Sequence, residues 1–177
     1  KKGKIIMKRI STGTENFKEL LDNNYYYVDK TSLIEDVLSD KVMLYTRARR
    51  FGKTLNLSML YYFFSNKEKE NSYLFEGLNI SKDKEILKHQ NQYPVIFLTL
   101  KDMNNNNFQS QIYIFTSLIA NIIDIYTEIK NSDTISQRER KLLDIYQNAE
   151  ADIDDLKVSL KILSHCLYKH YQQKVII

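Results

Sequence analysis

The sequence predicts an α/β fold with a mostly parallel sheet, because short buried strands alternate with amphipathic helices along the chain. Three apolar runs have the composition of strands that are buried on both faces, and they cover residues 42–45, 95–100 and 175–177. Between them lie long segments whose hydrophobic residues recur at helical spacing. Three strands are few for so many helices, so we expect the sheet to be incomplete within residues 1–177.

The first two predicted helices begin at Ser/Thr-x-x-Glu patterns, which have the spacing of a capping box. Thr12 with Glu15 opens one helix, and Ser32 with Glu35 opens the other. Between these helices, residues 25–28 are aromatic and β-branched and are expected to be extended. Further helices are predicted over about residues 53–65, 108–129, 136–147 and 153–171. In the helix at 53–65, we expect a buried face that carries Leu57, Leu60 and Phe64.

The bulk composition excludes several classes of protein. A hydrophobic content of 43% supports a packed core and excludes a disordered tail. The single cysteine, Cys166, excludes an internal disulfide and a zinc site built on several cysteines, and it fits a reducing, cytoplasmic compartment. No apolar run reaches membrane-spanning length, and a net charge of +4 does not by itself indicate nucleic-acid binding.

The most informative passage covers residues 42–60, where a predicted buried strand leads through a loop into a helix. The loop ends in Gly52-Lys53-Thr54. This strand–loop–helix context is the one that a Walker A phosphate-binding motif requires. Backbone N–H groups at such a helix start point at an anion, and the helix dipole adds positive potential. The match is incomplete, because Arg47 stands where the standard pattern has its first glycine.

The residues of this loop have distinct expected roles, with ATP and Mg²⁺ as the expected ligands. Gly52 lets the backbone approach a phosphate closely, where a Cβ atom would clash. Lys53 is the predicted catalytic residue and would reach the β- and γ-phosphates, while Thr54 would place its hydroxyl on Mg²⁺. The predicted nucleotide contacts are Arg49, Arg50, Phe51, Gly52, Lys53, Thr54 and Leu55.

Basic residues concentrate in the same loop, where Arg47, Arg49, Arg50 and Lys53 lie close together. Such a cluster is costly unless anions or carboxylates face it. A triphosphate is one candidate partner, and the backbone of a nucleic acid is a second. Carboxylates of the protein itself are a third. A degenerate scaffold that keeps the fold without binding a nucleotide is a further alternative.

Four stretches of the chain resemble the AAA-ATPase-like family of bacterial and archaeal ATPases. They read NFKELLDNNYYYVDKTSLIEDVL, LYTRARRFGKTLNLSMLYYFF, LFEGLNI and YPVIFLTLKD, and the resemblance covers essentially the whole chain. The most specific parts are YVDKT at residues 27–31 and RRFGKTLNLSML at residues 49–60. Relatives usually have TRPRRFGKT in the loop, so the missing first glycine is a family trait, and Ala48 stands where proline is usual.

The resemblance implies a three-layer P-loop NTPase fold of the AAA-related type, of which residues 1–177 would be the N-terminal part. It also implies that the terminal KVII opens the Walker B strand, which in relatives continues to an acidic Asp-Glu pair that holds Mg²⁺ and activates water. ATP hydrolysis is therefore expected only in the complete protein. In relatives a nuclease-like domain of the restriction-endonuclease superfamily often lies further downstream. Adenine and guanine are both open as the base.

The YVDKT motif and one loop aspartate have two readings each. Asp29, Lys30 and Thr31 either lie near the base or ribose of the nucleotide or form a structural turn at a helix start. Asp102 follows a predicted strand, and it is either close to Mg²⁺ or an ordinary loop residue.

The histidines give no strong indication of a metal. Only Cys166 and His170 share a helix face, and no further pair of ligands accompanies them or His165. We therefore expect a structural role for these residues, with Cys166 as a small buried hydrophobe.

Overall fold

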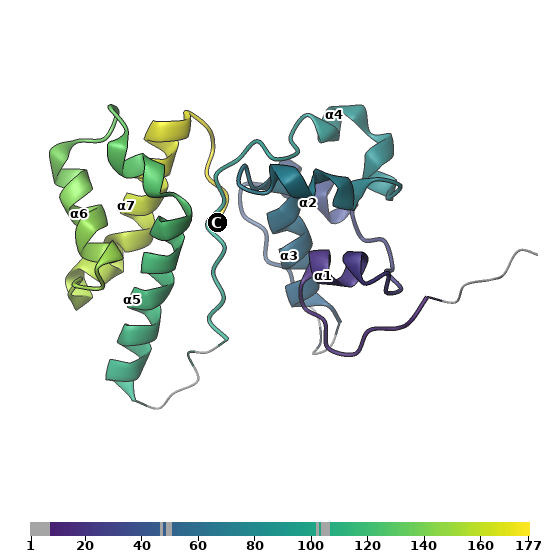
Figure 1. Cartoon of the computed structure of the whole chain (residues 1–177), viewed down its shortest axis with the longest axis horizontal. Coiled ribbons are helices and arrows are strands. Elements are labelled where there is room, and N and C mark those ends of the chain that lie inside the picture. Colours follow the sequence, from purple (N-terminus) through teal and green to yellow (C-terminus); the bar gives the residue numbers. More distant parts are fainter. Residues whose placement is uncertain (1–7, 47, 49–50, 102, 104–106) are drawn as a thin grey trace, which may run out of the picture. The chain divides into compact units, whose positions relative to one another are not determined.

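A computed structural model describes residues 8–46, 48, 51–101, 103 and 107–177 of the chain. The chain divides into two compact units, Lys1–Gln92 and Tyr93–Ile177, and both are built from helices (Figure 1). None of the helices in these described ranges combines the length and hydrophobicity that crossing a bilayer would require.

The first unit is organised around a central helix, α3. Its elements are α1 (Phe17–Asp22), α2 (Leu33–Ser39), α3 (Lys53–Phe64), the 3₁₀ helices η1 (Lys69–Phe75) and η2 (Asn79–Lys82), and α4 (Lys84–Leu87). Three aromatic rings join α1, α3 and η1: the centroid of Phe75 lies 5.4 Å from that of Phe17 and 5.1 Å from that of Phe63. All three side chains are buried. Such ring contacts add to the stabilisation that burial of apolar surface provides.

The second unit is a small helical bundle. It consists of α5 (Phe108–Ile125), η3 (Thr127–Asn131), α6 (Gln137–Gln147) and α7 (Ile153–Tyr171). Helix α5 packs against both α6 and α7, which also contact each other (Figure 1). Its buried core residues are Ile96, Ile119, Ile122, Ile123, Tyr126, Ile129, Ile135, Leu143, Tyr146, Leu163, Cys166 and Leu167.

The predicted three-layer α/β fold with a parallel sheet is wrong for the residues that the structure describes. They form isolated β-bridges and no sheet. The segment at 42–45 forms no strand and is only half covered, because Val42 and Leu44 are 90% and 87% exposed whereas Met43 and Tyr45 are half-buried. A short apolar run has the same composition whether or not strands lie beside it, since strand partners come from elsewhere in the chain.

The second predicted strand, at residues 95–100, pairs at one position. Val95 forms a parallel bridge with Ile176, in which Ile96 N donates to Ile176 O (2.8 Å) and Ile176 N donates to Pro94 O (3.1 Å). The N–H and C=O of Val95 are hydrogen-bonded to the hydroxyl of Tyr126, at 2.8 and 3.0 Å. A side chain therefore satisfies the backbone groups that a neighbouring strand would bind in a sheet.

The helix predictions agree better with the structure. The predicted ranges 136–147 and 153–171 correspond to α6 and α7, and the predicted long helix at 108–129 corresponds to α5 followed by η3. The two predicted capping boxes are wrong. Asn16 rather than Thr12 caps α1, and Ser32 makes no side-chain hydrogen bond at the start of α2.

The buried face of α3 agrees with the predicted one only in part. Phe64 is buried as predicted and Leu60 is half-buried, but Leu57 is 46% exposed, and Asn56, Ser58 and Met59 are buried instead. The helix is apolar around most of its circumference, so hydrophobic periodicity alone could not select the correct face. The elements from η1 to α4 have no counterpart among the sequence predictions.

Substitution of Tyr126 by phenylalanine should destabilise the second unit. The change leaves the buried N–H and C=O of Val95 without the hydroxyl that they bind, which typically costs about 1–3 kcal/mol. Urea unfolding should show a lower midpoint for Tyr126→Phe. The control Tyr113→Phe, at a position that is 71% exposed, should leave the midpoint unchanged, and an equal midpoint for both variants would contradict this account.

Candidate functional site

The Gly52-Lys53-Thr54 sequence lies at the start of α3, as predicted. Gly52 is the N-cap of this helix and has φ 73° and ψ 27°, in the left-handed region. Residues other than glycine adopt this conformation only at a steric cost. Beyond the chain neighbours of Gly52, a Cβ atom at this position would meet no atom of the described residues within 4 Å. In the protein alone, the glycine is therefore needed for its backbone conformation rather than for space.

The N-terminus of α3 lacks the features that neutralise most other helix starts in the described chain. Side-chain acceptors cap the other α-helices except α2, and they belong to Asn16, Asp83, Asn107, Ser136 and Asp152. Helix α2 has acidic residues in its first turn instead. Helix α3 has neither a side-chain cap from its N-cap residue nor an acidic residue in its first turn. The positive end of its dipole is thus suited to an anion from outside the helix.

The predicted contact residues lie around this helix end to the extent that the structure describes them. Phe51 is 61% exposed and Lys53 is also exposed, while Thr54 and Leu55 are half-buried. The side chain of Lys53 is therefore accessible to a ligand at the helix start. The predicted contacts Arg49 and Arg50, together with Arg47, lie outside the described residues.

Helix α3 is held in place from the side by hydrogen bonds to the start of α1. The hydroxyl of Ser58 accepts from the backbone N–H of Phe17 at 3.0 Å. Further along the helix, Nδ2 of Asn16 donates to the hydroxyl of Tyr62 at 3.2 Å. Ser58 is 7% exposed, so this bond satisfies a buried hydroxyl as well as a helix-start N–H.

The C-terminal end of α3 is closed by Asn91, a residue that sequence reasoning did not identify. Its backbone N–H donates to Phe63 O at 2.7 Å, and its Nδ2 donates to Tyr62 O at 3.0 Å and to Ser65 O at 2.9 Å. Asn91 is 5% exposed and has φ 55°, a left-handed conformation that asparagine tolerates. The tolerance of asparagine for the left-handed conformation is the only feature of the sequence that could have pointed to Asn91. It does not show which groups Asn91 binds. Among the described residues, Asn91 therefore binds the carbonyl groups at the C-terminal end of α3, whereas Gly52 gives no side-chain cap at the N-terminal end.

The YVDKT motif forms a structural turn, which was one of its two predicted readings. The carboxylate of Asp29 accepts from Thr31 N (2.9 Å), Thr31 Oγ1 (2.7 Å) and Asn79 N (2.6 Å). Thr31 Oγ1 in turn accepts from Ile80 N at 3.2 Å. These bonds connect the motif to the start of η2, about fifty residues further along the chain. Lys30 is exposed and takes no part in them.

The hydrogen bonds around Asp29 favour its charged form. Burial is the largest single effect and raises the pKa of Asp29, but the hydrogen bonds from Thr31 and Asn79 together outweigh it, and Lys82 adds a smaller attraction. The net pKa of Asp29 is lowered from its ordinary value. Because the folded-state pKa lies below the unfolded-state value, the carboxylate stabilises the fold above the unfolded-state pKa, and this stabilisation is lost as the pH falls through the folded-state pKa.

Substitution of Asp29 by asparagine should lower the free energy of unfolding by about 1–2 kcal/mol at pH 7, because a charge-assisted acceptor of three hydrogen bonds is lost. As the pH falls below about 5, the free energy of unfolding should also decrease less for the variant than for the wild type. Urea titrations at several pH values measure both effects. Asp133→Asn, at an exposed turn, controls for the loss of one negative charge. Parallel pH profiles for Asp29→Asn and the wild type would contradict the role assigned to Asp29.

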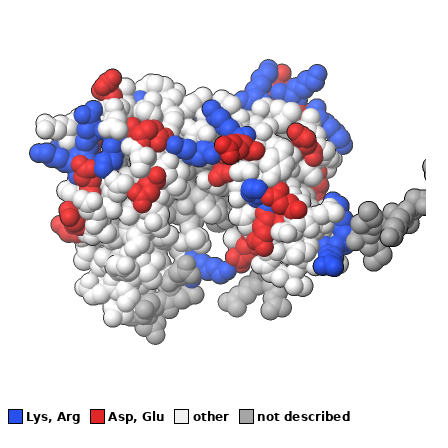
Figure 2. All heavy atoms as spheres, in the orientation of Figure 1, with Lys and Arg blue, Asp and Glu red and all other residues white. Residues whose placement is uncertain are grey.

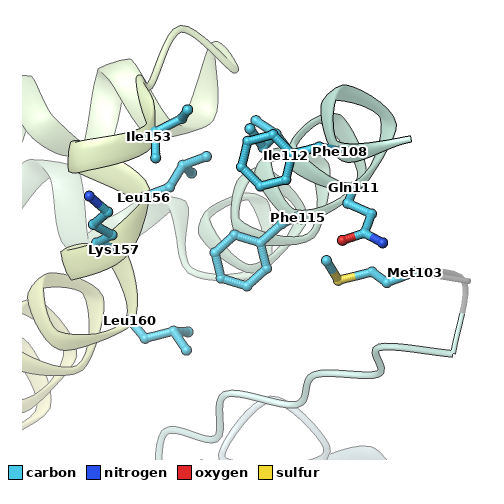
Figure 3. A pocket seen from close by; sticks show the side chains of 9 residues that line it. All are labelled: Met103, Phe108, Gln111, Ile112, Phe115, Ile153, Leu156, Lys157 and Leu160. Carbon is cyan, nitrogen blue, oxygen red and sulfur yellow. The ribbon is translucent and has the colours of Figure 1, made fainter. Parts of the chain in front are cut away.

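Two hollows lie elsewhere in the described chain. In the second unit, Phe108 and Phe115 of α5 and Leu156 and Leu160 of α7 line a cavity of about 330 Å³ (Figure 3). Its lining is mostly apolar, so it offers few groups that could orient a polar ligand. A hollow of about 380 Å³ between α2 and α4 in the first unit is more polar, and Glu35, Ser39, Asp83, Glu85, Lys88 and His89 are among its lining residues.

The structure confirms that Cys166 is a buried hydrophobe. Burial raises the pKa of its thiol to about 11. His165 lies 3.7 Å from a carboxylate oxygen of Glu139, and the ring of His170 contacts Tyr171. Within the described residues, no group of three or more His, Cys, Asp or Glu side chains is arranged to hold a metal ion.

Charged side chains of both signs are mixed on the face that Figure 2 shows. That face therefore gives no support to a large basic surface of the kind that binds a nucleic-acid backbone. The arginine cluster on which this alternative depends lies outside the described residues, as does Asp102.

The candidate site is thus the N-terminus of α3, which begins with the Gly-Lys-Thr sequence and is suited to an anion.

A comparison with known protein families gives a match over residues 11–177 to the family described as predicted AAA-ATPase. Since the match covers most of the chain, the protein belongs to this family, as its sequence motifs indicated. No curated protein and no solved structure gave a match.

Proposed function

We propose that this chain contains the ATP-binding P-loop module of an AAA-type ATPase and that it binds the phosphates at the N-terminus of α3. The uncapped start of this helix carries the proposal, because its amides and dipole favour an anion and no acidic side chain in its first turn opposes one. Membership of the predicted AAA-ATPase family supports a nucleotide as the source of that anion.

The residues at this helix end fit a nucleotide with its metal ion. Lys53 is exposed and would contact the β- and γ-phosphates as a point charge. The half-buried Thr54 would place its hydroxyl on Mg²⁺, an ion that prefers oxygen ligands. The backbone groups of Phe51, Gly52 and Leu55, with Arg49 and Arg50, complete the proposed contacts. Bound Mg²⁺ would neutralise charge on the phosphates.

The reaction proposed for the complete protein is hydrolysis of the bond between the β- and γ-phosphates of ATP. Catalysis would rest on positioning and on electrostatic stabilisation, since phosphoryl transfer requires little covalent chemistry from the protein. Lys53 contributes by holding the transferred phosphate where charge develops. A cytoplasmic location is part of the same proposal.

Substitution of Lys53 by alanine should weaken the binding of MgATP by about 10- to 100-fold, which corresponds to the loss of a hydrogen bond to a charged group. Titration of a fluorescent ATP analogue measures the affinity. Lys84→Ala is the matched control, because Lys84 is also exposed and is also the first residue of a helix, but Asp83 caps that helix. Equal and negligible signals for the wild type and Lys53→Ala would favour the degenerate scaffold.

Removal of the Thr54 hydroxyl should reduce the effect of Mg²⁺ on ATP binding. Thr54→Val keeps the shape of the side chain but not its oxygen, whereas Thr54→Ser keeps the oxygen. The ratio of ATP affinities with and without Mg²⁺ should fall towards one in Thr54→Val and stay near the wild-type value in Thr54→Ser. If both variants keep the wild-type ratio, Thr54 is not the metal ligand.

A further inference from the structure

We draw no further inference here: the strongest candidate, the mostly apolar cavity of about 330 Å³ between α5 and α7, has nothing among the described residues to show what covers it.

Discussion

The proposed phosphate site places one constraint on the first unit: α3 must be held firmly by contacts other than those at its first turn. A helix N-terminus attracts anions only if the protein leaves its positive end without a cap of its own. The N-terminal end of α3 then adds little to the stability of the helix. The helix must therefore be stabilised by packing and by hydrogen bonds elsewhere along its length. Burial of Met59, Phe63 and Phe64 and the bonds at Ser58, Tyr62 and Asn91 provide it.

The two ends of α3 are treated in opposite ways, and both treatments use a left-handed residue. At the N-terminal end, Gly52 takes φ 73° as the N-cap and brings no side-chain acceptor. At the C-terminal end, Asn91 takes φ 55° and its amide hydrogen-bonds the last carbonyl groups of the helix. The described contacts thus stabilise the end of α3 that meets the core, whereas Gly52 gives no side-chain cap to the end where we propose that a phosphate binds. This division fits a binding site that is built on a rigid element.

How far the sequence predicts the structure depends on the range of the interactions involved. Helices α5, α6 and α7 were predictable because their hydrophobic periodicity is a local signal; the capping box of Ser136 and Glu139 in α6 is also local, but it was not among those predicted from the sequence. The parallel sheet was not, because an apolar run does not show which partners its backbone finds. At Val95 the partners are Ile176 and the hydroxyl of Tyr126, which lies 31 residues away in the sequence.

By itself, the sequence determined that a helix begins at Gly52-Lys53-Thr54 and that the chain carries the motifs of its family, because both are properties of neighbouring residues. Only the tertiary structure decided how that helix is anchored. Asp29 binds Asn79, Asn91 closes α3, and Asn56 binds Tyr45 across the loop. These contacts join residues 11 to 50 positions apart, so they exist only after the chain has folded and leave no periodic pattern in the sequence.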